Sequence, residues 1–167
     1  AGKSLLFQYA TLRAAKSRKV VLLIVPTTAL ALDQERRFNE LFQKKRIPSI
    51  RLAFHSGLDD TERTEFFRRL HRAEQSIVIT SPESAVGSLA GILSDVAREG
   101  RLDWVAIDEA HLLTAWGDTF RPEFHLIAPL VAQWREDSPS GNRVRCLLLS
   151  ATFTEHAIDD LGQLADI

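Results

Sequence analysis

The sequence predicts an α/β fold in which a parallel sheet carries helices on both faces. Five apolar runs of strand length recur along the 167 residues, with amphipathic segments of helix length between them, which is the pattern of a sheet built from strand–helix–strand units. Most of these runs are continuously apolar, as strands covered on both faces are. The expected strands are residues 20–25, 49–54, 76–80, 102–108 and 143–150.

The helices in the first half of the chain carry recognisable start signals. We expect an opening helix over residues 3–18 and a second helix capped by Thr27 or Thr28. Asp59 and Glu62 have the spacing of a capping box ahead of a third helix. These signals place a helix before or after each of the first strands, as a doubly covered sheet requires.

The second half of the chain is punctuated in the same way. The run Ser-Pro-Glu at 81–83 supplies a cap, a first-turn proline and an acid, and it predicts one helix toward Arg98 that Gly100 ends. Residues 155–165 predict a last helix. The cluster Ser-Pro-Ser-Gly-Asn at 138–142 predicts a loop.

The composition of the chain excludes several classes of protein. Hydrophobic residues make up 45% and charged residues 26% of the chain, which excludes a disordered or low-complexity protein and, with the length, predicts a single domain over residues 1–167. Basic and acidic residues number 21 and 22, so any polyanion must be bound locally rather than by an overall positive field. The single cysteine, Cys146, excludes a disulfide framework. With no apolar run long enough for a membrane span, these features predict a soluble, intracellular protein.

The first residues have the composition of a phosphate-binding loop. Gly2, Lys3 and Ser4 precede the expected first helix, where a glycine admits phosphate to the backbone, a lysine reaches the β and γ oxygens, and a hydroxyl binds Mg²⁺. Taken alone, this tripeptide is also compatible with an ordinary helix start. Because the sequence opens in the middle of such a loop, we expect it to be an excised piece whose phosphate loop is truncated.

A second site follows the apolar strand 102–108. Asp108 and Glu109 end that strand and His111 follows, which puts two carboxylates at the carboxyl edge of the sheet, where open α/β sheets bind ligands. On this edge Asp108 suits Mg²⁺ binding and Glu109 suits polarisation of an attacking water. The alternative is a solvated helix cap with a structural histidine.

The last predicted strand, residues 143–150, leads into Ser-Ala-Thr, with hydroxyls at Ser150 and Thr152. Gly-Lys-Ser, Asp-Glu-Ala-His and Ser-Ala-Thr, in this order, resemble motifs I, II and III of superfamily 2 helicases and translocases. The resemblance implies a RecA-like P-loop NTPase domain that uses ATP and Mg²⁺. It also implies that His111, Ser150 and Thr152 link the ATP site to a second RecA-like lobe, which the sequence is too short to include.

Two further segments resemble the same superfamily. Pro26 and Thr27 open a stretch similar to motif Ia, and Thr80 and Ser81 open one similar to motif Ib. In the family these motifs touch the backbone of a single strand. A nearly neutral lobe can do this, because helix starts, backbone N–H groups and hydroxyl side chains bind phosphate without a large net charge.

An aromatic segment narrows the resemblance. Trp116, Phe120 and Arg121 lie in Trp-Gly-Asp-Thr-Phe-Arg-Pro, which resembles the aromatic-rich loop of RecQ-like DNA helicases. Aromatic faces stack on unpaired bases, and a neighbouring arginine can reach phosphate. The resemblance implies that these three residues bind single-stranded DNA and couple it to ATP hydrolysis. Asp118 and Thr119 depart from the family's His-Asp, and the aromatics could instead be core residues at helical spacing.

The sequence therefore predicts the first RecA-like lobe of a RecQ-like, DEAH-type, ATP-dependent DNA helicase. Lys3 would act with Asp108 and Glu109 in catalysis, and the partners would be single-stranded DNA, duplex junctions and the second lobe, with no membrane. The setting would be intracellular, and in a bacterium it would be the cytoplasm or nucleoid. The isolated piece is expected to be inactive, because an arginine from the second lobe stabilises the transition state in this family. The alternatives are an RNA helicase or duplex translocase, and a non-catalytic nucleotide-gated module.

Overall fold

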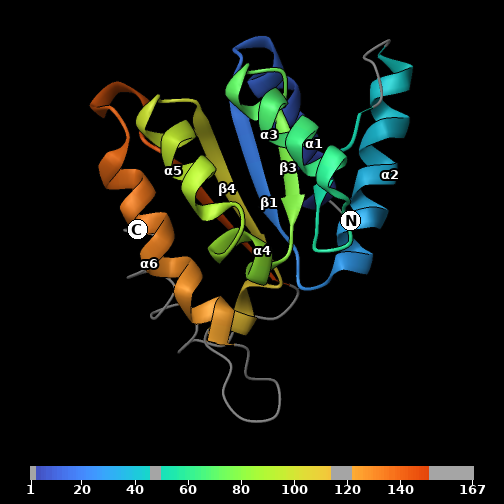
Figure 1. Cartoon of the computed structure of the whole chain (residues 1–167). Helices are drawn as coiled ribbons and strands as arrows, with labels where there is room; N and C mark the ends of the chain where they lie inside the picture. The colour runs from blue at the N-terminus through green and yellow to red at the C-terminus, as the bar shows by residue number, and fades with distance from the viewer. Residues whose placement is uncertain (1–2, 46–49, 114–121, 151–167) are drawn as a thin grey trace.

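One parallel sheet organises the chain. The structure, a computed structural model, describes residues 3–45, 50–113 and 122–150, and for residues 3–8, 113, 122 and 124 it describes the backbone alone. Its five strands lie in the order β2-β3-β1-β4-β5, and all four pairings are parallel (Figure 1). The strands are β1 (Val20–Ile24), β2 (Ala53–Phe54), β3 (Ile77–Thr80), β4 (Leu102–Asp108) and β5 (Arg145–Leu149).

The predicted strands are confirmed, with one marked difference. β4 has the bounds predicted from its apolar run, whereas β2 is only two residues long and covers the end of the predicted segment 49–54. β2 is an edge strand, and the N–H groups of Leu52, just before it, and of Ala53, its first residue, donate to the Glu35 carboxylate at 2.6 and 3.1 Å. A side chain thus takes the place of a further strand, and this protects the open edge.

Helices cover both faces of the sheet, as expected for a parallel sheet. One face packs on the first two helices and the other on the remaining four, as the two separate core clusters show. Short 3-10 turns occupy Ala110–Leu113 and Ser140–Asn142. The helices are α1 (Lys3–Lys16), α2 (Thr28–Lys44), α3 (Asp60–His71), α4 (Pro82–Val86), α5 (Ala90–Arg98) and α6 (Pro122–Asp137).

The predicted caps form, and one predicted helix is divided. Thr27 accepts the Leu30 N–H as the N-cap of α2, and Asp59 forms the predicted capping box at α3. Gly100 follows α5 with φ +68°, the left-handed conformation that suits glycine. The expected single helix toward Arg98 is wrong, because the chain turns at Gly87 and separates α4 from α5.

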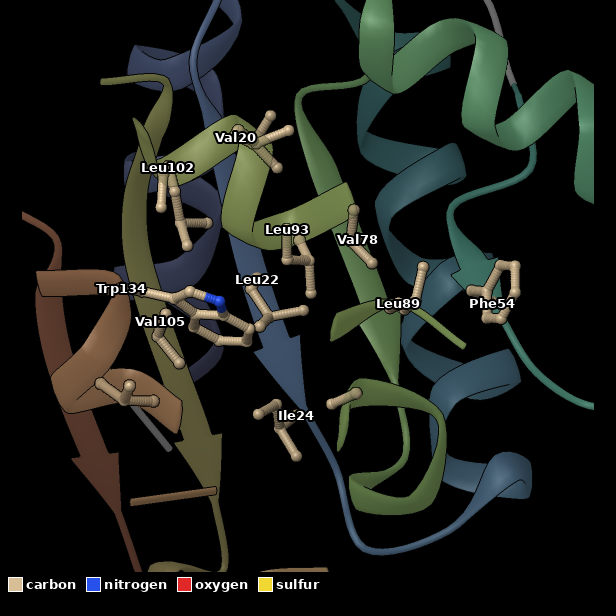
Figure 2. Packing of buried hydrophobic residues seen from close by; sticks show 14 of the residues in the cluster. Val20, Leu22, Ile24, Phe54, Val78, Leu89, Leu93, Leu102, Val105 and Trp134 are labelled. Atoms are coloured by element: carbon tan, nitrogen blue, oxygen red, sulfur yellow. The ribbon is translucent and has the colours of Figure 1, made fainter. Parts of the chain in front are cut away.

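The larger core cluster lies between the sheet and α3 to α6. Leu22, Val105 and Leu93 converge there on the indole of Trp134 (Figure 2). Trp134 is fully buried, and its Nε1 donates to Ser94 Oγ at 3.0 Å. Burying a side chain of this size stabilises the layer by about 2 to 3 kcal/mol. This packing fixes α5 and α6 against β1 and β4, whose carboxyl ends carry the candidate site.

Candidate active site and nucleic-acid interface

The carboxyl ends of the inner strands lie level with one another. Ile24 at the end of β1 is in register with Thr80 of β3 on one side and with Ile107 of β4 on the other. Asp108 is in register with Leu149 of β5. The residues that follow these strand ends therefore share one edge of the sheet, which is where open parallel sheets bind their ligands.

Glu109 has an unusual backbone conformation. Its φ is +52°, in the left-handed region that non-glycine residues seldom adopt. The conformation is held on both sides, because the Glu109 N–H donates to Asp108 Oδ1 at 3.1 Å and the Glu109 carbonyl accepts from Leu112 N at 2.9 Å. Such strain costs about 1 to 2 kcal/mol and typically marks functional positions. This left-handed conformation turns the chain out of β4 immediately after Asp108.

His111 connects the end of β4 to the end of β5. Its Nδ1 lies 2.9 Å from Ser150 Oγ and 3.4 Å from Glu109 Oε2. The side chains of His111 and Glu109 are 38% and 35% exposed, so both remain accessible from solvent. The structure thus brings together three of the predicted site residues, Glu109, His111 and Ser150.

Asp108 has the chemistry that a Mg²⁺ ion needs from a protein. One carboxylate oxygen accepts the Glu109 N–H, and among the residues that the structure describes the other oxygen has no hydrogen-bond partner. Mg²⁺ in nucleotide sites is held by one or two such oxygen ligands together with waters and phosphates. Asp108 fits this role, whereas no cluster of three or more histidine, cysteine or acidic side chains suits a metal ion within the described ranges.

The predicted phosphate loop is described only in part. α1 begins at Lys3, and only residues 17–19 connect it to β1, so the helix runs back along the strand and its first turn lies toward the carboxyl edge. The side chains of Lys3 and Ser4, and all of Gly2, lie outside what the structure describes. Their roles stay predictions.

Three of the predicted strand-binding residues, Pro26, Thr27 and Ser81, line a hollow at the ends of β1 and β3. This open hollow has a volume of about 500 Å³. Thr28 and Ser81 contribute hydroxyls to it, and among the described residues Ser81 has no side-chain capping bond. We call it the hydroxyl hollow, and its lining residues are Pro26, Thr27, Thr28, Ser56, Arg63, Ser81, Glu83, Ser84, Gly87 and Ser88.

Thr80 was predicted to bind DNA, but its side chain is not accessible from the hydroxyl hollow. It is fully buried, and its Oγ1 donates to the Phe54 carbonyl at 2.8 Å. Its carbonyl accepts the Val25 N–H at 2.9 Å. Thr80 therefore joins three strand ends rather than lining the hydroxyl hollow, and only its neighbour Ser81 faces that space.

The sequence analysis predicted no role for several residues that line the hydroxyl hollow, among them Ser56, Arg63, Ser84 and Ser88. The available signal was weak: Ser84 and Ser88 are four residues apart in the sequence, and Arg63 follows the Asp59 cap by four residues. Trp116, Phe120, Arg121 and Thr152, which were predicted to bind or couple, lie outside the described residues.

Cys146 is not a candidate nucleophile for the carboxyl edge of the sheet. It lies within β5, and burial raises the pKa of its thiol to about 11. The thiol is the unreactive form of cysteine, and it predominates at every pH well below 11. Cys146 is therefore a packing residue, partly buried against the larger core cluster.

Comparison with known proteins supplies the family. The family model for the DEAD/DEAH box helicase matches residues 1–161. The chain is 31% identical over 170 residues to the ATP-dependent DNA helicase Q4 of Mus musculus, covering 98% of this chain and 13% of that protein. It is 30% identical over 129 residues to the ATP-dependent DNA helicase RecQ of Synechocystis sp., covering 77% of this chain and 25% of that one.

Solved structures show the same fold. The DUF1998 helicase MrfA superposes with a TM-score of 0.76 at 21% identity, over 99% of this chain and 25% of that protein. The structure of MrfA bound to DNA superposes with a TM-score of 0.74 at 20% identity, over 99% of this chain and 22% of that one. The sheet is thus that of a RecA-like helicase domain, and the chain spans a quarter or less of these proteins. Since the family match runs through nearly all of its length, the chain belongs to the DEAD/DEAH box helicases.

Proposed function

We propose that this chain is the ATP-binding and hydrolysing lobe of a RecQ-like helicase, which couples hydrolysis to movement on single-stranded DNA and to duplex unwinding. The observation that carries the proposal is the accessible Glu109 carboxylate, held 3.4 Å from the His111 ring, which in turn meets Ser150 at 2.9 Å. Family membership supports the ATPase reaction. The relatives named as DNA helicases of the Q and RecQ types support the choice of nucleic acid.

The proposed ATP site uses residues from the end of β4 and from the start of α1. Lys3 and the adjoining backbone N–H groups would bind the phosphates, and Ser4 and Asp108 would hold Mg²⁺, which would supply charge neutralisation for phosphoryl transfer. The Glu109 carboxylate orients a water toward the γ-phosphate and accepts its proton. The left-handed backbone at Glu109 supports this role, because strained backbone conformations are typical of functional positions.

His111 and Ser150 suit a role in coupling. His111 contacts the Glu109 carboxylate, and its hydrogen bond to Ser150 reaches the residue after β5, two positions before Thr152. We propose that this contact transmits the state of the nucleotide to the second lobe, and that Trp116, Phe120 and Arg121 report the presence of a DNA strand. The link from Glu109 to Ser150 through one imidazole supports the first part of this proposal.

The hydroxyl hollow suits the backbone of a single strand. Thr27, Ser81 and their neighbours offer hydroxyl groups at the ends of β1 and β3. Hydroxyl and backbone N–H donors bind phosphate and sugar without reading sequence. The near-neutral charge of the chain, 21 basic against 22 acidic residues, is compatible with such local contacts.

Hydrolysis is expected to need more than this lobe. The chain matches only 13% of the mouse relative, so the activity of the whole protein belongs to this proposal. An arginine that reaches the γ-phosphate raises turnover by about 10³- to 10⁵-fold in phosphoryl transfer. We therefore expect negligible ATPase activity from the 167 residues alone.

The test is steady-state ATP hydrolysis by the full-length protein at one fixed salt concentration, because such affinities depend steeply on salt. The rate is measured without nucleic acid and with single-stranded DNA, single-stranded RNA or duplex DNA. We expect single-stranded DNA to stimulate hydrolysis most, and Trp116→Ala to remove most of that stimulation.

The other outcomes are equally informative. Stimulation by RNA or duplex DNA alone contradicts the RecQ-like proposal and favours another branch of the superfamily. Absence of hydrolysis under every condition favours a non-catalytic, nucleotide-gated module. DNA-stimulated turnover by the 167 residues alone would contradict the need for a second lobe.

A further inference from the structure

Arg63 is fixed in place by the turn that precedes its own helix. Its Nε donates to the Leu58 carbonyl at 3.1 Å and its Nη2 to the Ser56 carbonyl at 2.9 Å. The turn is closed by His55, whose Nδ1 accepts the Gly57 N–H at 3.1 Å and whose carbonyl accepts the Leu58 N–H at 3.2 Å. The guanidinium is therefore held by a turn that is itself hydrogen-bonded.

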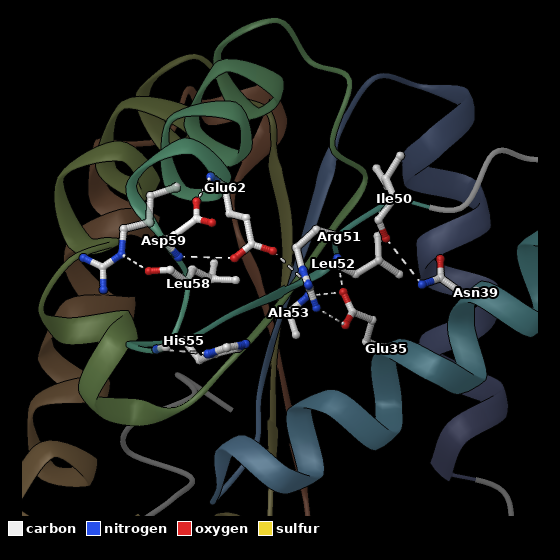
Figure 3. A network of polar contacts seen from close by, with 12 residues as sticks. Glu35, Asn39, Ile50, Arg51, Leu52, Ala53, His55, Leu58, Asp59 and Glu62 are labelled. Atoms are coloured by element: carbon white, nitrogen blue, oxygen red, sulfur yellow. Dashed lines mark hydrogen bonds and ion pairs between the residues drawn. The ribbon is translucent and has the colours of Figure 1, made fainter.

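Hydrogen bonds at the start of α3 connect the turn at residues 55–58 to the rest of the fold (Figure 3). Asp59 and Glu62 form the capping box of α3, and the other oxygen of Glu62 accepts from Arg51 at 2.9 Å. Arg51 also donates to Glu35 at 3.1 Å, which ties this end of α3 to α2. Flexibility of the arginine is thus removed before any ligand arrives, which lowers the entropic cost of binding.

Arg63 keeps unused hydrogen-bonding capacity toward the hydroxyl hollow. A guanidinium has five N–H donors, and the contacts to Leu58 and Ser56 account for two of them. Among the described residues of the lining, Arg63 is the one base and Glu83 the one acid. Around them, the hydroxyls of Ser56, Ser81, Ser84 and Ser88 donate to no protein acceptor within the described part of the chain.

We propose that Arg63 binds a backbone phosphate of the single strand that occupies the hydroxyl hollow, with the neighbouring serine hydroxyls contacting the same backbone. This inference rests on the proposed function. A phosphodiester matches the site because it carries one negative charge and several acceptor oxygens, which suit a fixed fork of N–H donors beside hydroxyl groups. The hollow contains no aromatic residue among those described, so bases stack elsewhere.

The experiment measures the dissociation constant of a fluorescent oligothymidylate from the nucleotide-free, full-length protein at several salt concentrations. Arg63→Gln keeps a donor for the turn but removes the charge, and we expect the dissociation constant to rise about tenfold. We also expect the slope of log affinity against log salt to fall by about 0.7, the contribution of one phosphate on a single strand.

The matched control is Arg98→Gln. Arg98 is also on a helix facing solvent, 58% exposed and paired with Asp95 at 2.6 Å, but it ends α5 just before β4 begins, at the opposite edge of the sheet. The control makes the same change in net charge, and we expect its dissociation constant to stay within twofold and its salt slope to stay unchanged. Arg63→Lys retains the charge, so its salt slope should stay near wild type while affinity falls about threefold.

The outcomes separate the inference from the proposed function. If the wild-type protein binds no single-stranded DNA, the proposed function fails and this inference fails with it. If the wild type binds but Arg63→Gln and Arg98→Gln are alike in affinity and salt slope, Arg63 contacts no phosphate. A lowered melting temperature with an unchanged salt slope for Arg63→Gln and Arg63→Lys would assign Arg63 to the turn alone and overturn the inference.

Discussion

The two halves of the carboxyl edge differ in how they use charge. At the ends of β4 and β5, Asp108 and Glu109 are adjacent carboxylates, Glu109 has φ +52°, and His111 bridges to Ser150 at 2.9 Å. At the ends of β1 and β3, the hydroxyl hollow is lined chiefly by small polar side chains and one anchored arginine. The first half places two adjacent carboxylates beside a strained backbone, whereas the hollow holds one base and one acid, Arg63 and Glu83, among hydroxyl groups.

The difference matches the role that we propose for each half. Moving a proton from water requires a carboxylate at one fixed position, and a strained backbone held by hydrogen bonds supplies it. Following a DNA backbone requires many weak, exchangeable contacts that do not trap the strand. The same sheet edge can serve both purposes, because each strand end projects a separate loop.

The largest effect is expected at Glu109. Glu109→Gln removes the proton acceptor and keeps the size of the side chain, so hydrolysis by the full-length protein should fall at least 100-fold. Binding of single-stranded DNA should stay within twofold, because Glu109 does not line the hydroxyl hollow. The measurements are single-turnover hydrolysis and fluorescence anisotropy.

Glu40→Gln is the matched control for this variant. Glu40 is exposed on α2 and pairs with Arg36 at 2.8 Å, and it lies outside both halves of the edge. Hydrolysis by Glu40→Gln should match wild type. If Glu109→Gln retains more than a tenth of the wild-type rate, Glu109 is not the general base.

The next largest effect is expected for Glu35→Ala, which changes the β2 edge of the sheet and leaves β4 intact. It leaves the buried N–H groups of Leu52 and Ala53 without their acceptor and removes one of the two carboxylate partners of Arg51, at a cost of about 2 to 3 kcal/mol. If opening is local, hydrogen-exchange protection of residues 50–55 should fall about 30- to 150-fold.

Protection within β4 should stay within a few-fold of wild type in the same experiment. Glu35→Gln keeps an acceptor oxygen and should lose less protection than Glu35→Ala. Equal loss along β4 would show that Glu35 stabilises the whole sheet rather than the β2 edge.

His111→Ala tests the bridge between β4 and β5. It removes the contacts to Ser150 and Glu109, so we expect the stimulation of hydrolysis by single-stranded DNA to fall about tenfold, within the usual range of coupling energies. ATP affinity should stay within twofold. A drop confined to the rate without DNA would instead place His111 in the chemical step.

The smallest effect concerns the backbone at Glu109. Glycine adopts φ +52° without strain, whereas alanine does not. We expect Glu109→Gly to be about 1 kcal/mol more stable than Glu109→Ala in thermal denaturation, with both equally inactive. Equal stability of the two variants would contradict strain at this position.

Much of the fold follows from short-range patterns. The bounds of β4 are those of its apolar run, and the caps at Thr27 and Asp59 form as their spacing predicts. Two misses have physical causes. Gly87 divides the helix expected toward Arg98, and α6 was not anticipated, since Pro129 in its middle argues against a helix.

The site was predictable to the extent that it is local in sequence. Asp108, Glu109 and His111 lie within one motif, and the strand ends around them follow from the parallel sheet. The role of Thr80 and the contribution of Arg63 were not predictable, because each depends on carbonyl acceptors in another segment, at Phe54 for Thr80 and at Ser56 and Leu58 for Arg63. The left-handed backbone at Glu109 likewise has no signature in residue type.

The division of the edge into a catalytic and a strand-binding half is tested most directly by titrating single-stranded DNA into the hydrolysis assay for the wild type and Arg63→Gln. We expect Arg63→Gln to raise the half-saturating DNA concentration about tenfold and to leave the maximal rate within twofold of wild type. A maximal rate lowered tenfold at saturating DNA, with no change in the half-saturating concentration, would contradict this division.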